Sequence, residues 1–210
     1  MKLKSKSVGK ILNIFLWVAL VINAVVLGNL VVAQFIGIGQ NFIRFDQFAT
    51  ILLMGVMILA SFIYLFWIFK VHQDLKSLDE NYPNTPWGAI RRIVIPFYNI
   101  YGLWNVYSTM EKDFKLSEST HKLGSTLNTL VPIYFILLFV TRGFNNYITD
   151  TSLNEISNVI WFLSYSFDFV LVIIFIFMRN IVSNGLMIRS EEKSVEEEEE
   201  NLEEEVATTL

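Results

Sequence analysis

The chain has 210 residues, of which 53% are hydrophobic, 15% aromatic and only 17% charged. Soluble domains usually carry about 25% charged residues, so this chain has too few charges to cover a surface that faces water. Cysteine is absent, which excludes disulfides, thiolate metal ligands and cysteine nucleophiles.

Four apolar stretches are long enough to cross a hydrocarbon core, which takes roughly 18–20 helical residues. They cover residues 11–33, 48–69, 123–141 and 158–178. The first follows several lysines, as in a secretory signal, but its apolar core exceeds the roughly 7–15 residues of such signals. We therefore expect an uncleaved first span. The sequence predicts an all-α fold, an integral membrane four-helix bundle.

The positions of Lys and Arg predict the orientation, because short cytoplasmic loops carry an excess of these residues. With the N-terminus inside, only Arg44 and Arg142 fall outside. The basic residues that fall inside are Lys2, Lys4, Lys6, Lys10, Lys70, Lys76, Arg91, Arg92, Lys112, Lys115, Lys122, Arg179, Arg189 and Lys193. We expect both termini in the cytoplasm and a location in the cell inner (plasma) membrane.

A fifth apolar stretch, 87–110, is also long enough to span, but Arg91, Arg92, Pro96 and Asn99 interrupt it. If it crossed, the basic residues after it would move outside and the charge bias would vanish. We therefore predict a cytoplasmic re-entrant or interfacial amphipathic segment. Proline should break its helix, and the asparagine should cap a new one.

The same segment contains a candidate lipid-interface or re-entrant motif: Trp87, Arg91, Arg92, Pro96 and Asn99. The arginines suit anionic lipid headgroups, and aromatic residues suit the headgroup belt. One interpretation is a plain amphipathic anchor. The alternative is a broken helix that lines a small ligand site, since irregular backbone at membrane depth needs protein or water around it.

Asp168 is the one acidic residue inside a predicted span, about 15 Å from its outer end at 1.5 Å per residue. A charged carboxylate there costs at least ~2.5–3.5 kcal/mol, so the side chain should face the bundle interior. Asn23 and Tyr134 reach a similar depth and complete a candidate intramembrane polar cluster. The cluster would either hold helices together by hydrogen bonds or carry a cation or proton.

Half of the 20 acidic residues lie in Glu191–Glu205. Like charges in a block repel and bury no core, so we predict a membrane domain over 1–189 and a disordered acidic cytoplasmic tail over 190–210. The tail is either a docking arm for a protein partner or a solvated end. The rest of the chain is basic, which suits anionic headgroups on the cytoplasmic face rather than nucleic acid.

The order of features in 62–111 resembles a bacterial membrane family, domain of unknown function 4328. The resemblance rests on Pro86-Trp87-Gly88-Ala89-Ile90, followed by Ile95-Pro96-Phe97-Tyr98-Asn99. It implies a protein with several spans in a bacterial-type cell membrane and singles out Trp87, Pro96 and Asn99. The family brings no assigned activity.

The sequence contains no paired catalytic groups, and its two histidines lack the spacing of a metal site. We therefore expect no enzymatic activity, no cofactor and no metal. The favoured interpretation is a non-enzymatic membrane scaffold or interaction protein. The alternative is a small transporter or channel component that uses Asp168 at the membrane midplane.

Overall fold

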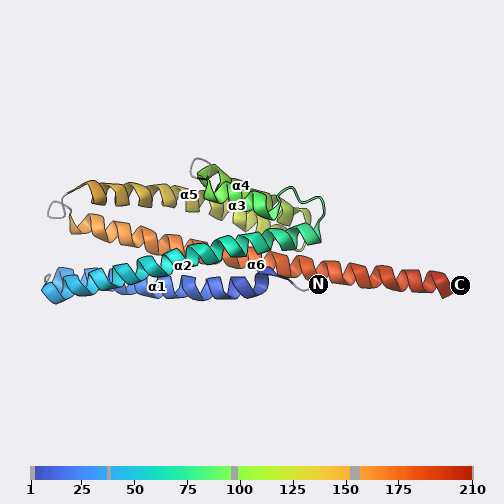
Figure 1. Ribbon diagram of the computed structural model, residues 1–210, viewed down its shortest axis with the longest axis horizontal. Coiled ribbons are helices and arrows are strands. Elements are labelled where there is room, and N and C mark those ends of the chain that lie inside the picture. Colours follow the sequence, from blue (N-terminus) through green and yellow to red (C-terminus); the bar gives the residue numbers. More distant parts are fainter. Residues whose placement is uncertain (1–2, 37–38, 96–98, 152–156, 210) are drawn as a thin grey trace. The chain divides into compact units, whose positions relative to one another are not determined.

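The computed structural model describes residues 3–36, 39–95, 99–151 and 157–209, with the backbone alone at 34, 36, 99, 100, 158, 200 and 203–209. The described residues are mostly helical and include no strand, which confirms the all-α fold class. The helices are α1 (Ser5–Ile36), α2 (Gln40–Leu78), α3 (Pro86–Val94), α4 (Asn99–Leu116), α5 (His121–Asp150) and α6 (Asn158–Thr209) (Figure 1).

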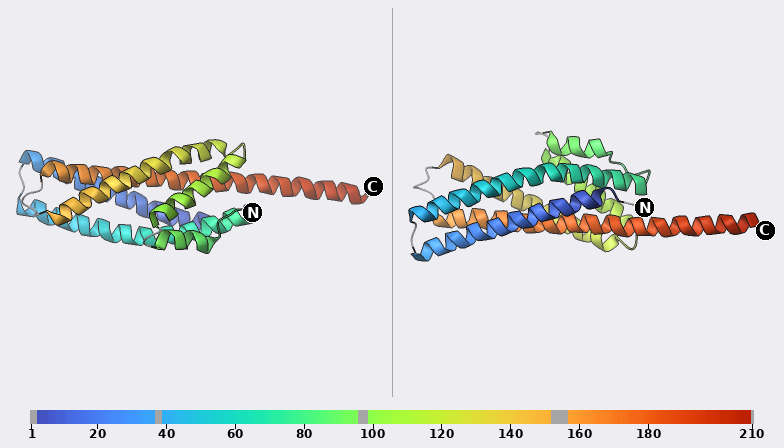
Figure 2. Two further views of the ribbon diagram at one scale, coloured as in Figure 1. Left: turned by 90° about the horizontal axis from the view of Figure 1, so that it is seen from above. Right: turned by 60° about the horizontal axis from the view of Figure 1, so that its bottom comes forward.

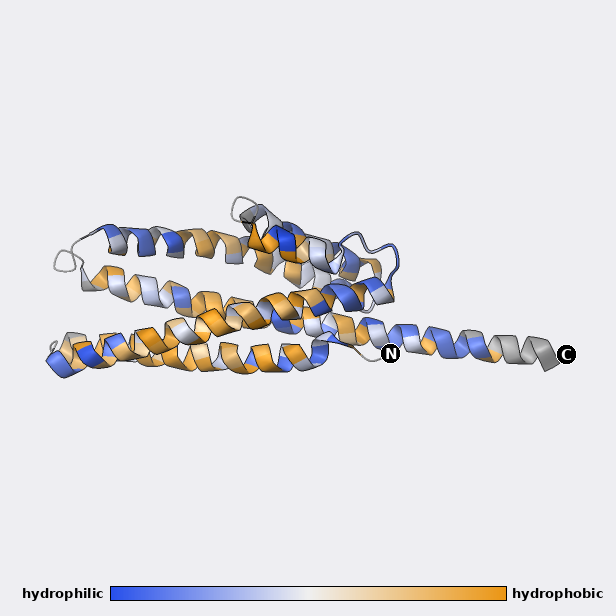
Figure 3. Cartoon of the chain, in the orientation of Figure 1, coloured by the Kyte–Doolittle hydropathy of each residue, from blue (hydrophilic) through white to orange (hydrophobic). Residues whose placement is uncertain are grey.

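Four helices within the described residues, α1, α2, α5 and α6, are long and apolar enough to cross a membrane. Each contains one of the four predicted stretches, so the prediction of four helices of spanning length is confirmed. Figure 3 shows apolar residues along the central parts of these helices and polar residues along the last part of α6. Only 17% to 28% of the most apolar stretch of each helix is buried in the fold.

The structure differs from the expected disorder of the acidic tail, because α6 continues as one helix from Asn158 to Thr209. Glutamate is a good helix former, so its intrinsic preference favours this conformation despite the repulsion between neighbouring charges. The tail also extends an existing helix, which removes the cost of nucleating a new one.

The fifth apolar stretch forms two helices instead of one. Thr85 caps α3, where its Oγ1 accepts the backbone N–H of Gly88 at 3.1 Å, and Pro86 occupies the first turn. Nine residues extend only about 14 Å at 1.5 Å per residue, so α3 is too short to cross a bilayer. α3 ends at Val94 and its C-cap residue Ile95 is extended, so this helix ends just before Pro96, which itself lies outside the described residues.

The chain divides into two compact units. Unit 2 comprises Lys10–Tyr64 and Leu130–Met178, which hold most of each predicted span. Unit 1 comprises Met1–Gly9, Leu65–Thr129 and Arg179–Leu210, which hold most of the segments expected in the cytoplasm. The sequence predicted one membrane domain and a tail, and did not predict that the connecting segments form a unit of their own.

Unit 2 has an unusual distribution of polarity. Its buried residues include the polar side chains of Asn23, Thr141 and Ser164, and Ser164 donates to the amide oxygen of Asn145 at 3.1 Å. Large apolar side chains cover its outside, among them Ile14, Phe48, Ile51, Met54, Phe62 and Ile136. An exterior of this kind suits lipid, and buried polar groups join helices where lipid offers no hydrogen bonds.

Unit 1 has an apolar core like that of a soluble helical domain. Trp67, Ile68 and Leu75 of α2 are at most 1% exposed. Further buried apolar residues come from the segments that follow α2 and from α6: Tyr82, Ala89, Val106, Tyr107, Met110, Phe114, Leu127, Val182 and Leu186. The last turns of α2 thus lie at the centre of a folded unit.

Among the described glycines, those of unit 1 allow close helix contacts and those of unit 2 do not. A Cβ on Gly102 of α4 would lie 1.9 Å from the backbone oxygen of Arg92, and one on Gly185 of α6 would lie 2.8 Å from the ring of Phe114. In contrast, a Cβ on Gly143 of α5 would meet nothing within 4 Å. The start of α4 can therefore approach the end of α3 only because residue 102 has no side chain.

Candidate functional site in unit 1

The end of α2 holds the beginning of α1. The two carboxylate oxygens of Asp74 accept the backbone N–H groups of Lys4 at 2.9 Å and Ser5 at 2.8 Å. Asp74 is fully buried. The first amides of a helix have no partner within the helix and carry partial positive charge, so a carboxylate satisfies and stabilises them.

The same end of α2 also binds α6. The ammonium of Lys193 donates to the backbone oxygen of Ser77 at 2.8 Å and of Leu78 at 3.3 Å. These carbonyls belong to the last turn of α2, where unpaired oxygens give the helix end a partial negative charge. Lys193 is therefore a cationic cap on α2, supplied by α6.

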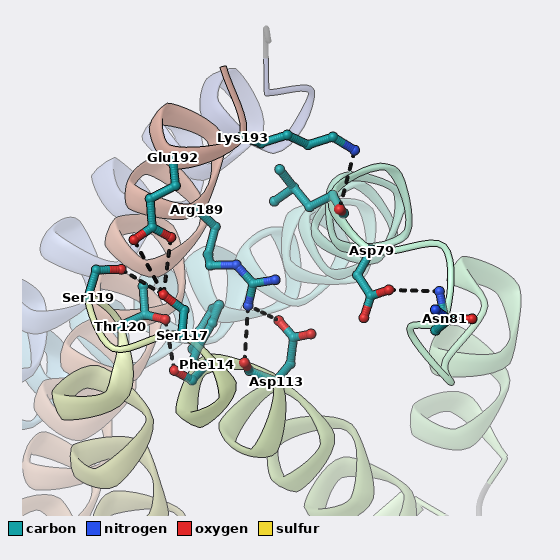
Figure 4. Close-up of polar contacts among 11 residues, drawn as sticks. Asp79, Asn81, Asp113, Phe114, Ser117, Ser119, Thr120, Arg189, Glu192 and Lys193 are labelled. Carbon is teal, nitrogen blue, oxygen red and sulfur yellow. Dashed lines mark hydrogen bonds and ion pairs between the residues drawn. The ribbon is translucent and has the colours of Figure 1, made fainter. Parts of the chain in front are cut away.

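Two further contacts join α6 to α4 and to the turn after it. Arg189 donates to the backbone oxygen of Asp113 at 3.1 Å and forms an ion pair with its carboxylate at 3.3 Å. Ser117 donates to the two carboxylate oxygens of Glu192 at 3.1 and 3.3 Å. We call Arg189, Glu192 and Lys193, with these partners, the clasp (Figure 4).

Asp113 is the buried carboxylate of the clasp. Burial raises the pKa of its carboxyl above the ordinary value, the charge of Arg189 opposes this rise, and the charge of Asp79 adds to it. Only 6% of the Asp113 side chain is exposed, so its charge depends on the nearby guanidinium. Removal of Arg189 would leave a buried carboxylate without its counter-ion.

A cleft of about 860 Å³ lies beside the clasp. Its lining mixes the cations Arg189 and Lys193 with carboxylates, hydroxyls and a few apolar side chains, namely Leu78, Leu116, Ser117, Ser119, Ile188, Glu191, Glu192, Val195 and Glu196. Both cations are already bound to protein oxygens. Within the described residues, no group of three or more His, Asp and Glu side chains lies close enough to hold a metal ion.

The structure separates the two arginines of the candidate lipid-interface motif. Arg92 donates from one nitrogen to the amide oxygens of Asn84 and Asn105, so it joins the loop before α3 to α4. Arg91 is exposed. Trp87 is 65% exposed, and its ring lies against Phe69 of α2, with the two centroids 5.1 Å apart.

Two residues of that motif lie partly or wholly outside the described part of the chain. Pro96 is not described, and of Asn99 only the backbone is, at the first position of α4. The predicted capping role of the Asn99 side chain therefore stays a prediction.

The candidate intramembrane residues lie in unit 2. Asn23 is 2% exposed, and Tyr134 packs near Phe175, with their ring centroids 6.0 Å apart. Asp168 is half-buried. Among the described residues, no hydrogen bond or ion pair joins Asp168 to either of the other two, so the structure does not bring the three side chains into a bonded cluster.

The clasp and the Asp74 cap were not found from the sequence. Each joins residues that are 69 to 116 positions apart, and such pairs leave no local pattern of spacing. The one available signal was the basic residues Arg189 and Lys193 just before a long acidic run. That signal indicates a charged helix but does not reveal its partners.

By the length and composition of four helices, the chain falls in the class of helical membrane proteins. Comparisons of the chain with protein-family models, with curated protein sequences and with solved structures gave no match. The resemblance to the family called domain of unknown function 4328 stays a prediction.

Proposed function

We propose that this chain is a non-enzymatic membrane scaffold that holds an acidic helix in a fixed position on the cytoplasmic face. Four apolar helices supply the anchor. The observation that carries the proposal is the clasp, which binds α6 to α2 and α4 just before the unbroken run of glutamates that begins at Glu196.

The acidic helix is the proposed docking arm. Figures 1 and 2 show α6 extending past the other elements of unit 1. Its charged residues include Glu196, Glu197, Glu198 and Glu199, which are exposed, and Leu202 among them is 61% exposed. A rigid helix with this charge attracts a basic protein surface and sets its position relative to the membrane.

A docking role also gives a reason for the clasp contacts at Arg189 and Lys193 of α6. A docking arm on a flexible linker samples many positions, and a partner must then overcome that conformational entropy. Because Arg189 and Lys193 are each bound on a different helix, the arm leaves unit 1 in one direction. The clasp therefore lowers the entropic cost of binding.

Photocrosslinking from the acidic helix in intact cells tests the proposal. A photoreactive residue at Leu202 should give a discrete protein adduct, whereas one at Leu116, which is 79% exposed in the same unit, should not. Replacing Glu196–Glu199 with glutamine should remove the adduct. Equal adducts from both positions, or none from Leu202, would contradict a docking role.

The alternative function, a small transporter or channel component, depends on Asp168. The purified chain in proteoliposomes should give no proton or cation flux above that of empty vesicles. A flux that disappears in Asp168→Asn would overturn the scaffold and establish the transporter.

A further inference from the structure

We propose that the outward face of α3, continued by the start of α4, binds the headgroups of anionic lipids, and that Arg91 is the residue that contacts their phosphates. This inference does not depend on the scaffold role, because it concerns a different surface from the acidic helix.

The residues of this face have the composition of a membrane interface. Trp87, Arg91 and Val94 are spaced i, i+4 and i+7, so they share one side of α3, and all three are exposed. Ala89, on another side of the helix, is fully buried inside unit 1. An exposed side with tryptophan, valine and arginine suits the boundary between acyl chains and headgroups.

The first turns of α4 add to the same composition. Tyr101 is 64% exposed and Trp104 is 39% exposed, three positions apart on one side of α4. α3 and α4 pack closely where Gly102 meets Arg92. Tyr101 and Trp104 are within two residues of Gly102 in the sequence, so they flank this close contact. We call Trp87, Arg91, Val94, Tyr101 and Trp104 the headgroup surface.

The contact between Trp87 and Phe69 indicates the depth of this surface in the membrane. Phe69 is the last residue of the apolar stretch 48–69, and Lys70 follows it directly. The two aromatic rings lie with their centroids 5.1 Å apart. Trp87 therefore sits where α2 leaves the hydrocarbon, which is the depth that tryptophan prefers.

The different environments of Arg91 and Arg92 indicate which of the two residues contacts the lipid phosphate. Arg92 is held inside unit 1 by Asn84 and Asn105. Among the described residues, the Arg91 side chain makes no hydrogen bond or ion pair, and it is exposed. An exposed guanidinium at this level forms charge-assisted hydrogen bonds with lipid phosphate.

Spin labelling of the full chain in nanodiscs tests the depth of the surface. The chain contains no cysteine, so Val94→Cys gives one labelling site, and Val195→Cys on the exposed part of α6 gives a matched control. Accessibility to oxygen and to a water-soluble nickel complex should place the label at position 94 at headgroup depth and the label at 195 in water.

Two outcomes would overturn the proposal. A label at position 94 that is as accessible to nickel as the label at 195 would mean that the face is open to water, as a protein-binding surface would be. A label that reaches the acyl chains, accessible to oxygen alone, would mean that the segment is re-entrant and not interfacial.

Variants of the arginines test the lipid specificity. Titrating phosphatidylglycerol into phosphatidylcholine nanodiscs should reduce the mobility of the label at 94, and Arg91→Gln should weaken the apparent affinity about fivefold, as expected for one basic residue near an anionic surface. Arg91→Lys should restore most of it. An Arg91→Gln variant with an unchanged titration would rule out the phosphate contact, since this exposed residue supports no part of the fold.

Discussion

The carboxylate of Asp74 and the backbone amide of Ser5 lie 2.8 Å apart although 69 residues separate them, so the end of α2 caps the start of α1. The cap links the first and second long helices outside their apolar parts. Together with the Lys193 contacts to Ser77 and Leu78, it makes the last turns of α2 the point where three helices meet.

Removing this cap should destabilise the protein measurably. Asp74→Ala deletes the acceptor of two amides, and we expect a loss of about 1–2 kcal/mol, or more if the amide of Ser5 stays buried without a partner. Thermal unfolding in detergent micelles measures the change. Asp79→Ala is the matched control, because within the described residues the Asp79 carboxylate accepts one amide, that of Asn81, and this contact is exposed. Equal losses in both variants would contradict the capping role.

The pair of Arg189 and Asp113 should make stability depend on pH. Burial raises the pKa of Asp113, so between its ordinary value and the raised one the native state binds more protons than the unfolded state. The free energy of unfolding therefore falls as pH rises through that interval. Arg189 opposes the raised pKa, so Arg189→Gln should extend the fall to higher pH.

A double-mutant cycle isolates this pair. Arg189→Gln should cost about 2–3 kcal/mol at neutral pH, somewhat less than the roughly 3–5 kcal/mol of a fully buried pair, because Arg189 is partly exposed. Adding Asp113→Asn should recover part of the loss and remove the pH dependence. Losses that simply add would show that the two side chains do not interact.

Much of the fold follows from the sequence because apolar length is a direct consequence of membrane thickness. The stretches 11–33, 48–69, 123–141 and 158–178 each fall inside one long helix, and α3 ends at Val94, two residues before the proline that was expected to break it. The extent of each helix was harder to predict. Hydropathy marks only the apolar part, whereas α2 continues to Leu78 and α6 to Thr209.

Unit 1 was not predicted because its core is assembled from distant parts of the chain. Leu75, Phe114 and Leu186 are buried together in unit 1, yet each lies in a stretch that looks mixed and polar in the sequence. Arg91 and Arg92 are likewise equivalent in the sequence. Only the fold shows that one is exposed and the other is bound to two amide side chains.

Glycine substitutions should distinguish the two units. Gly102→Ala places a Cβ 1.9 Å from a backbone oxygen, so α3 and α4 must separate, and overpacking of this kind costs about 1–3 kcal/mol or more. Gly143→Ala meets nothing within 4 Å and should be neutral or stabilise α5 by up to about 1 kcal/mol. Unfolding of both variants in the same detergent gives the comparison, and a tolerated Gly102→Ala would contradict the close crossing.

Asp168→Asn should leave the fold intact. Among the described residues, the Asp168 side chain has no hydrogen bond or ion pair, so the substitution removes no such contact. A neutral amide also costs less free energy in hydrocarbon than a charged carboxylate. We expect an unfolding temperature equal to or above that of the unmodified chain. A clear loss of stability would show that Asp168 joins helices through its carboxyl group.

The sidedness of the membrane tests the account most directly, because the proposed scaffold requires unit 1 to face the cytoplasm. Since the native chain has no cysteine, Leu202→Cys and Gln40→Cys each offer one thiol to a membrane-impermeant maleimide on intact cells. We predict that position 40 is labelled at once and position 202 only after permeabilisation. Labelling of position 202 on intact cells would contradict the account.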